Sequence, residues 1–295
     1  MSPTRIAALT ALTMLAFAGN SLLCRVALKE TSIDPASFVT IRLISGAVVL
    51  WIVVRLLERS RGVQAGAGNW LSAFALFAYA AGFSFAYLSL TAGMGALLLF
   101  GTVQATMIGY GVWAGERLRT WELAGLALAL GGLVGLLLPG LAAPPVLGAT
   151  LMVVAGVAWG VYSIRGKRGG DPTQVTAGNF LRTIPFAVAL SLVTLDRAKL
   201  DGAGVAYAIA SGALASGIGY AIWYAVLPAL KASLSATVQL SVPPIAAVGG
   251  ILFLGETVSL RLVLASIATL GGIGLVIWAK RGGTKAPLDA PAEGK

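Results

Sequence analysis

The chain has 295 residues, of which 58% are apolar and only 11% are charged, against roughly 25% charged in an ordinary soluble domain. With a mean hydropathy of +0.89, it cannot cover a water-facing surface with polar groups, so composition excludes a soluble globular protein and favours a membrane protein. The net charge of +10 does not indicate nucleic-acid binding, because the basic residues form short clusters at the ends of apolar runs, as topology signals do.

Polar, glycine or proline breaks divide the chain into runs of about 19 to 25 residues, the length that crosses a bilayer. We interpret the first run as a membrane helix, because no small-residue cleavage site that would mark a signal peptide follows it. The fold class is therefore an all-α membrane protein. Its ten predicted transmembrane helices cover residues 4–26, 36–57, 69–90, 93–114, 120–138, 146–166, 174–195, 203–226, 232–254 and 259–280, and a disordered tail covers 282–295.

The Lys and Arg residues predict the orientation of these helices. If the N-terminus is cytoplasmic, fourteen of the 21 basic residues fall on the cytoplasmic side and five on the opposite side, and Arg42 and Arg182 lie inside spans. The excess of positive charge marks the cytoplasmic side of a membrane protein. An even number of spans then places the C-terminus in the cytoplasm as well.

An internal repeat appears when the sequence is moved by 140 positions. Charged and glycine-rich motifs then coincide, which hydrophobicity alone does not produce. The matches are Thr40–Ile44 with Phe180–Ile184, Gly115-Glu116 with Gly255-Glu256, Gly131-Gly132 with Gly271-Gly272 and, a few residues out of register, Asp34-Pro35 with Asp171-Pro172.

Each copy of the repeat contains five spans, over residues 1–140 and 141–281. Five is odd, so the second copy must enter the membrane from the opposite side, and the two halves are expected to be inverted. Inverted repeats are the usual basis of alternating access around a site near the midplane. We therefore expect two inverted five-helix repeats around a central cavity, and secondary transport as the function.

These features together resemble the EamA-type drug/metabolite transporter superfamily, along the chain from about Thr4 to Lys280. The resemblance is carried by ten spans, the Asp-Pro before span 2, the arginine within it and the Gly-Glu that closes spans 4 and 9. Within the superfamily the chain is most similar to the YddG branch of bacterial amino-acid exporters. The resemblance implies a basket with a cavity lined by spans 1, 3, 4, 6, 8 and 9, in a multi-pass protein of the bacterial inner membrane.

The sequence does not favour an enzyme, a cofactor or a metal. There is no histidine, only one cysteine (Cys24), and no phosphate-binding or nucleophile-elbow motif. An intramembrane hydrolase, the competing class, needs a Ser–Lys or Asp–Asp pair at depth. All eleven acidic residues lie at or beyond span ends. The same absence favours facilitated movement over strong ion coupling, which commonly uses a membrane-embedded carboxylate.

Arg42 and Arg182 are the two charges expected within the membrane. One interpretation is a clamp for a substrate carboxylate. We prefer structural ion pairs between the halves, Arg42 with Glu256 and Arg182 with Glu116, because buried charges are usually paired.

Uncharged polar and aromatic residues on the inner spans are the candidates for the substrate cavity. An unsatisfied amide is costly in hydrocarbon, so such side chains must face one another, the backbone or water. A cavity with aromatic walls and neutral polar groups suits small amphipathic or zwitterionic solutes. The candidates are Asn20, Tyr79, Ser84, Gln104, Trp159, Tyr162, Tyr220, Tyr224 and Gln239.

Pro243 and Pro244 lie in the middle of span 9 and predict a local bend that is a candidate hinge. Small-residue patterns spaced four apart, such as Gly131 with Gly135, fit close helix packing within a monomer, although a dimer seam fits them as well.

The predicted function is export of amino acids, aromatic ones included, or of similar small metabolites by alternating access. Export itself comes from the family resemblance. Two alternatives stay open, a transporter of another small solute or drug in the same fold, and a membrane binding or assembly protein that transports nothing.

Overall fold

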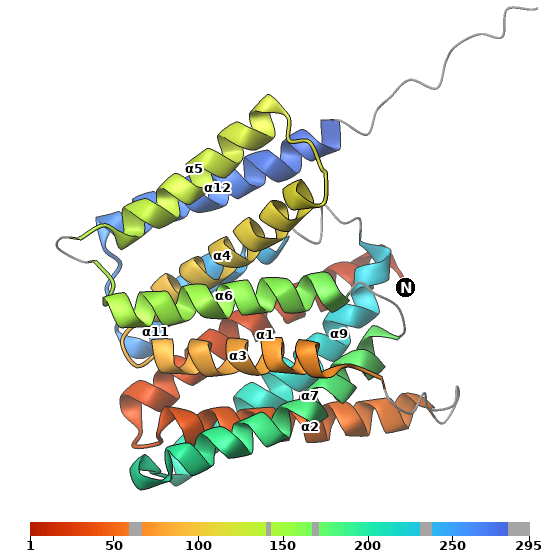
Figure 1. Cartoon of the computed structure of the whole chain (residues 1–295), viewed down its shortest axis with the longest axis vertical. Coiled ribbons are helices and arrows are strands. Elements are labelled where there is room, and N and C mark those ends of the chain that lie inside the picture. The colour runs from red at the N-terminus through yellow and green to blue at the C-terminus, as the bar shows by residue number, and fades with distance from the viewer. Residues whose placement is uncertain (59–66, 140–142, 167–170, 231–237, 283–295) are drawn as a thin grey trace, which may run out of the picture.

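The computed structural model describes residues 1–58, 67–139, 143–166, 171–230 and 238–282, and the regular elements in these ranges are all helical. Eight of the described helical stretches are long and apolar enough to cross a bilayer, and α3 and α11 are shorter apolar helices. Figure 1 shows them packed side by side. They are α1 (Pro3–Glu30), α2 (Pro35–Glu58), α3 (Trp70–Ala86), α4 (Ala92–Trp113), α5 (Thr120–Leu137), α6 (Val146–Gly166), α7 (Pro172–Val193), α8 (Gly202–Ala210), α9 (Gly219–Val226), α11 (Val242–Leu254) and α12 (Leu260–Gly282).

The predicted all-α, multi-span fold is confirmed. Nine of the predicted spans coincide with described helices to within a few residues at most ends. The first part of span 9 and the predicted disordered tail beyond residue 282 lie outside the described residues. Near Pro243 the structure has a turn at Leu240 and Ser241, after which α11 begins with proline in its first turn. A proline is tolerated there because the first N–H groups of a helix have no partner within the helix.

The matching motifs of the two halves build matching local structures. Asp34 and Asp171 each accept hydrogen bonds from the backbone N–H groups two and three residues further on, and so cap α2 and α7. After α4 and α11, Gly115 and Gly255 adopt positive φ angles of 96° and 61°, which glycine tolerates without strain. The repeated motifs are therefore the signals that start and stop equivalent helices.

The helices α5 and α12 pack against each other in opposite directions. Gly132 contacts Thr269, and Ala129 contacts Gly272. Adding 140 to one number and subtracting 140 from the other converts the first contact into the second, as expected when a two-fold axis relates the halves. The guanidinium of Arg261, at the start of α12, donates to the carbonyl of Gly135 near the end of α5.

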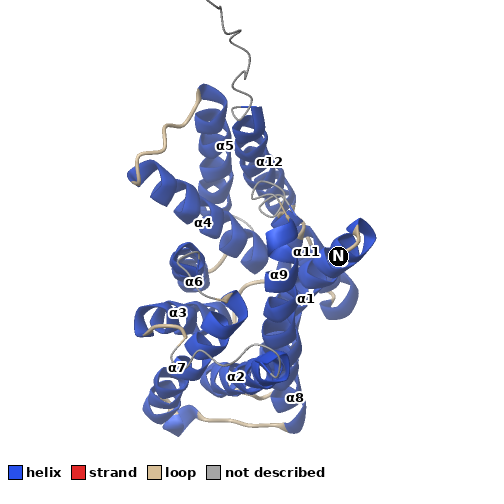
Figure 2. Cartoon of the chain, turned by 90° about the vertical axis from the view of Figure 1, so that its right-hand side faces the viewer, coloured by secondary structure: helices blue, strands red, loops and turns tan. Residues whose placement is uncertain are grey.

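The second antiparallel pair is α2 with α7, in which the Thr40 hydroxyl donates to the Ala187 carbonyl at 3.1 Å and Gly46 lies against Phe180. Figures 1 and 2 both place α5 and α12 at one end of the molecule and α2 and α7 at the other. The helices between these two pairs supply the core that contains the cavity.

The stretch between α8 and α9 departs from the expected plain helix, because Ser211–Ile218 (η2) is π-helical. Such segments are rare and frequent at functional sites. Gly212 lets this segment approach α2, since a Cβ there would collide with the backbone carbonyl of Arg42.

Candidate functional site

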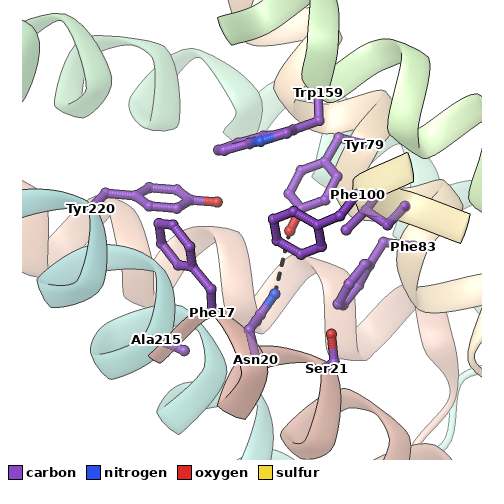
Figure 3. Close-up of a pocket in the computed structure, with 10 residues that line it drawn as sticks. Phe17, Asn20, Ser21, Tyr79, Phe83, Phe100, Trp159, Ala215 and Tyr220 are labelled. Carbon is purple, nitrogen blue, oxygen red and sulfur yellow. Dashed lines mark hydrogen bonds between the residues drawn. The ribbon is translucent and has the colours of Figure 1, made fainter. Parts of the chain in front are cut away.

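A cavity lies among α1, α3, α4, α6, η2 and α9, so both halves of the chain contribute to it (Figure 3). The free space between its side chains is small. Its volume of about 20 Å³ is enough for one or two water molecules. The side chains must therefore part before a solute enters. The lining residues are Phe17, Asn20, Ser21, Tyr79, Phe83, Leu99, Phe100, Trp159, Ala215 and Tyr220.

Trp159 is the centre of an aromatic wall. Its ring stacks on Tyr220 and on Tyr162, with centroid separations of 5.3 Å and interplanar angles of 28° and 27°, and lies 4.7 Å from the ring of Tyr79. Phe17 meets Tyr220 edge-on at 5.7 Å. Figure 3 shows the rings of Trp159, Tyr79, Tyr220 and Phe17 around one space. Such a wall offers flat apolar faces on which another ring can stack.

A short chain of hydrogen bonds forms the polar part of the cavity. The Asn20 amide donates to the Tyr79 hydroxyl at 3.3 Å, and its carbonyl accepts from the Ser211 hydroxyl at 2.7 Å. The Arg42 Nη2 donates to the same Tyr79 hydroxyl at 3.1 Å. Ser211 is the first residue of the π-helical segment, so the unusual backbone places the group that orients Asn20.

Arg42 is almost fully buried, with 2% of its surface exposed. Its guanidinium lies 5.3 Å from the ring centroid of Tyr79 and 4.9 Å from that of Phe83, distances that allow cation–π attraction. Its Nε and Nη1 have no hydrogen-bond partner in the structure. The side chain therefore lies directly behind two lining residues of the cavity.

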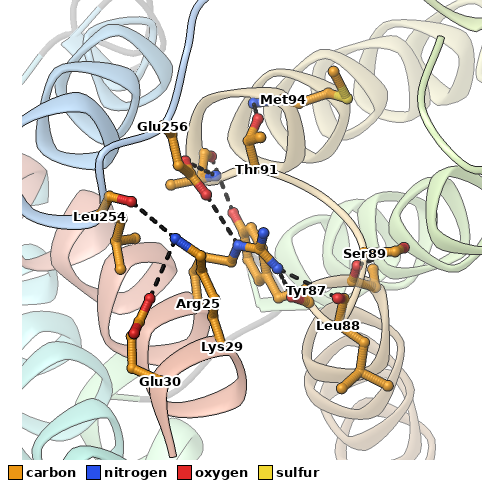
Figure 4. Close-up of polar contacts among 12 residues, drawn as sticks. Arg25, Lys29, Glu30, Tyr87, Leu88, Ser89, Thr91, Met94, Leu254 and Glu256 are labelled. Atoms are coloured by element: carbon orange, nitrogen blue, oxygen red, sulfur yellow. Dashed lines mark hydrogen bonds and ion pairs between the residues drawn. The ribbon is translucent and has the colours of Figure 1, made fainter. Parts of the chain in front are cut away.

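The expected pairing of Arg42 with Glu256 is wrong, because Glu256 binds Arg25 instead. Arg25 Nε and Glu256 Oε1 are 2.9 Å apart, with side-chain exposures of 12% and 7%. The other carboxylate oxygen accepts from the backbone N–H of Ala92 at 2.8 Å, and Arg25 Nη1 also donates to the Tyr87 carbonyl. Figure 4 shows this cluster joining the ends of α1, α3, α4 and α11. We call this side of the bundle the Glu256 end.

Two loops are also held together at the Glu256 end. Asp34 accepts from the backbone N–H of Lys199 at 2.9 Å, and Asp201 accepts from the backbone N–H of Ser32 at 2.7 Å. Burial alone would raise the pKa of Asp34, but the hydrogen bonds donated by Ser37, Lys199 and Ala36 outweigh it and hold the pKa below its usual value. The ionised carboxylate is therefore the form that holds these loops.

The opposite side of the bundle, which we call the Arg165 end, has its own polar contacts. Arg165 Nε donates to Ser72 at 3.1 Å, and its Nη2 donates to Asn69 at 3.2 Å, both at the start of α3. The backbone N–H of Asn69 donates in turn to the Asn179 side chain at 2.9 Å. These contacts join α3 to the end of α6 and the start of α7.

No ion pair between described residues joins Arg182 to Glu116, so the second expected pair is absent as well. Arg182 Nη1 donates to the carbonyls of Ala67 and Gly178 at 2.7 and 2.9 Å. The carboxylate of Glu116 folds back against Gly111, and both charged residues make further contacts.

Of the nine predicted cavity residues, Asn20, Tyr79, Trp159 and Tyr220 line the cavity. Ser84 and Gln104 are buried but do not line it. Tyr162 lies behind it, stacked on Trp159. The remaining two predicted residues, Tyr224 and Gln239, are partly buried outside the lining.

The apolar lining residues carry no signal in the sequence, because Phe17, Phe83 and Phe100 occur mid-span as ordinary core residues do. Arg25 lies within the predicted span 4–26, and its position in the sequence only groups it with the basic residues of the non-cytoplasmic side and assigns it no partner. A signal for it does exist, since the 140-residue offset places Arg25 on Arg165 and so marks an arginine repeated near the end of the first span of each half.

Comparison with known proteins agrees with this architecture. The profile of the EamA-like transporter family matches residues 146–278. An uncharacterised Pseudomonas aeruginosa protein is 55% identical over 277 residues, covering 94% of this chain and 96% of that protein. This chain belongs to the EamA-like transporter family.

Two other relatives are named as transporters. An uncharacterised transporter from Archaeoglobus fulgidus is 26% identical over 90% of this chain and 94% of its own length. The threonine/homoserine exporter RhtA of Salmonella typhimurium is 30% identical over 126 residues, 42% of each chain. A crystal structure that is 19% identical aligns with a TM-score of 0.66 over 95% of this chain and 99% of the other, which supports the fold alone.

Family membership makes the chain a multi-pass membrane transporter of small solutes and not an enzyme. The part of the chain that the structure describes contains no cluster of three or more residues able to hold a metal ion.

Proposed function

We propose that this EamA-like protein exports amino acids, aromatic ones included, or similar small amphipathic metabolites by alternating access. The observation that carries the proposal is the aromatic and polar cavity, which takes its lining from α1, α3 and α4 of the first half and from α6, η2 and α9 of the second. A site at the junction of two repeats changes its exposure when one repeat moves against the other.

The repeat also supplies a physical basis for two opposite-facing states. The 140-residue offset maps Arg25 and Glu256 at one end onto Arg165 and Glu116 at the other. In this structure Arg25 binds Glu256, whereas Arg165 binds the start of α3. We infer that the halves, residues 1–140 and 141–281, are inverted, and that exchange of these contacts accompanies transport.

The substrate class follows from the cavity. Stacked rings around Trp159 accommodate an apolar or aromatic body, and Asn20 and Tyr79 supply neutral hydrogen-bonding groups for a polar head. RhtA, which shares part of the sequence, is a threonine/homoserine exporter. Amino acids combine the small size and amphipathic character that such a cavity accepts.

We infer further that movement is facilitated, because no Asp or Glu lines the cavity and a carboxylate at depth is the common device for proton or sodium coupling. The distribution of Lys and Arg supports a position in a bacterial inner membrane with both termini cytoplasmic. With that orientation the Glu256 end faces outward.

The test is efflux from liposomes that contain the purified protein and labelled amino acids, with phenylalanine and threonine in the panel. Trp159→Ala should slow the efflux of phenylalanine, because it removes the central stacking ring. The matched control is Trp278→Ala, since Trp278 is 64% exposed and lies outside the cavity lining.

Each alternative has its own outcome. Saturable efflux of amino acids with no accompanying proton flux supports the proposal, and coupled proton flux contradicts facilitated movement. If other solutes move and amino acids do not, the chain transports a different class. If no solute moves while the protein is folded, a binding or assembly role replaces transport.

A further inference from the structure

Arg42 carries a positive charge that the described protein does not neutralise. It lies in α2 at 2% exposure, and the ionisable groups that interact with it are Tyr79, Tyr220 and Cys24, none of which is a carboxylic acid. Two of its three guanidinium nitrogens have no hydrogen-bond partner. A buried charge without a counter-ion is strongly unfavourable, so this arrangement points to a missing partner.

The equivalent arginine of the second half shows what a structural role looks like. Arg182 aligns with Arg42 at the 140-residue offset, but its guanidinium donates to the backbone carbonyls of Ala67 and Gly178. Arg182 therefore joins the start of α3 to α7 with ordinary hydrogen bonds. Arg42 makes no hydrogen bond to a backbone carbonyl within the described residues, and the hydrogen bond that it does make goes to Tyr79, a lining residue of the cavity.

Arg42 acts on the cavity through Tyr79. The Tyr79 hydroxyl already accepts from Arg42 Nη2 at 3.1 Å and from Asn20 Nδ2 at 3.3 Å. With both of its lone pairs used, the hydroxyl keeps its own hydrogen to donate. In Figure 3 this hydroxyl points toward Asn20 on the cavity side. The polar end of the cavity therefore presents hydrogen-bond donors with a positive charge directly behind them, and none of its described lining residues is acidic.

We propose that Arg42, Tyr79 and Asn20 form an anion subsite, and that it recognises the carboxylate of the substrate. Arg42 provides the charge, and Tyr79 and Asn20 provide donors at the cavity surface. Parting of the rings, which a solute requires in any case, brings the carboxylate within reach of the unpartnered Nε and Nη1. This inference rests on the proposed transport function and refines it by naming the group that is recognised.

The same geometry makes the amino group of an amino acid dispensable. None of the cavity-lining residues is acidic, so an ammonium group has no counter-ion there. The apolar body of the substrate lies on Trp159 and Tyr220 instead. A monocarboxylate with an aromatic or apolar tail should therefore bind at least as well as the corresponding amino acid, and a cationic amine should bind poorly.

The test compares three probes that share a phenyl ring and a three-carbon chain: 3-phenylpropionate, 3-phenylpropionamide and 3-phenylpropylamine. Binding to the full chain in nanodiscs is measured by calorimetry and by tryptophan fluorescence at neutral pH. We expect the carboxylate to bind about 10- to 100-fold more tightly than the amide, the range for a hydrogen bond to a charged group. The amine should bind no more tightly than the amide.

Arg42→Gln should remove this preference for the carboxylate. It should not lower the thermal unfolding midpoint, because the substitution removes a buried charge that has no counter-ion. Arg42→Lys keeps the charge and should retain part of the preference. The matched control is Arg182→Gln, which should lower the midpoint and leave the preference intact. If Arg42→Gln keeps the preference, or if wild-type protein binds the three probes equally or not at all, the proposal is wrong.

The liposome assay separates this proposal from the proposed function. Arg42-dependent binding of 3-phenylpropionate with no flux of any solute supports the anion subsite and contradicts transport. Amino-acid efflux that is unaffected by Arg42→Gln supports transport and contradicts the subsite.

Discussion

Replacing Glu256 by glutamine tests the contact that closes the Glu256 end. The carboxylate accepts one hydrogen bond from Arg25 and one from the Ala92 backbone, and both side chains of the ion pair are at least 88% buried. Breaking a buried pair costs about 3–5 kcal/mol because the remaining charge is uncompensated. Arg25 still donates hydrogen bonds to the carbonyls of Tyr87 and Leu88 in the variant. We therefore expect the free energy of unfolding to fall by about 3 kcal/mol, the lower end of this range.

The matched control is Glu30→Gln. Glu30 pairs with Lys29, but their side chains are 53% and 37% exposed, and an exposed pair contributes about 0–1 kcal/mol. Unfolding of both variants in detergent is followed by circular dichroism during titration with a denaturing surfactant. Equal losses for the two variants, or no loss for Glu256→Gln, would refute the view that burial makes the Arg25–Glu256 contact important.

A transporter adds a second readout for the same variant. If the opposite-facing state lies only a few kcal/mol above this one, losing the Glu256 contact shifts the population toward that state before it unfolds the protein. A cysteine introduced at Ser21, on the cavity lining, should then react faster with a thiol reagent applied from the Glu256 end. An unchanged rate would contradict a closing role for the contact.

The other predictions concern packing, acidity and the exchange of contacts. Gly272→Ala should cost about 1–3 kcal/mol because its Cβ would lie 2.5 Å from backbone atoms of α5, whereas Gly274→Ala, with nothing within 4 Å, should not lower the unfolding free energy. The depressed pKa of Asp34 stabilises the folded state above its unfolded pKa of about 4. That contribution should disappear as the pH falls through the lower folded value, and Asp34→Asn should remove this part of the acid sensitivity in a pH series of unfolding curves. Cysteines at Arg165 and Glu116 should cross-link more when the Glu256 end is opened by Glu256→Gln, and an unchanged yield would contradict the exchange of contacts.

The sequence predicted those parts of the structure that depend on one segment at a time. Apolar runs located the spans, and the repeated Asp-Pro and Gly-Glu motifs marked helix starts and stops because caps and positive φ angles are local requirements. The π-helical Ser211–Ile218 was not predictable from hydropathy, which is the same for α- and π-helical backbone. This segment packs closely against α2 through Gly212, and a contact between two segments cannot be predicted from the hydropathy of either one alone.

The ion-pair assignments failed for a related reason. Depth in the membrane and side of the membrane predict which charged residues lie at the same end of the bundle, but pairing also depends on the rotation of each helix. Arg25 lies 231 positions from Glu256 and on a different helix from Arg42. A carboxylate binds whichever guanidinium its helix face meets, and this is fixed by tertiary packing.

The repeat and the candidate site draw on different parts of the sequence. Positions that keep their identity between halves, such as Gly132 and Gly272, pack helices in equivalent arrangements. Arg42 and Arg182 also keep their identity, yet only Arg182 finds carbonyl partners. The surroundings of the two arginines have diverged, so that Arg182 binds backbone carbonyls in one half, whereas Arg42 lies behind the cavity lining in the other. This difference between equivalent positions is what the proposed anion subsite requires, because a substrate with one charged end needs a charge on one side of the cavity only.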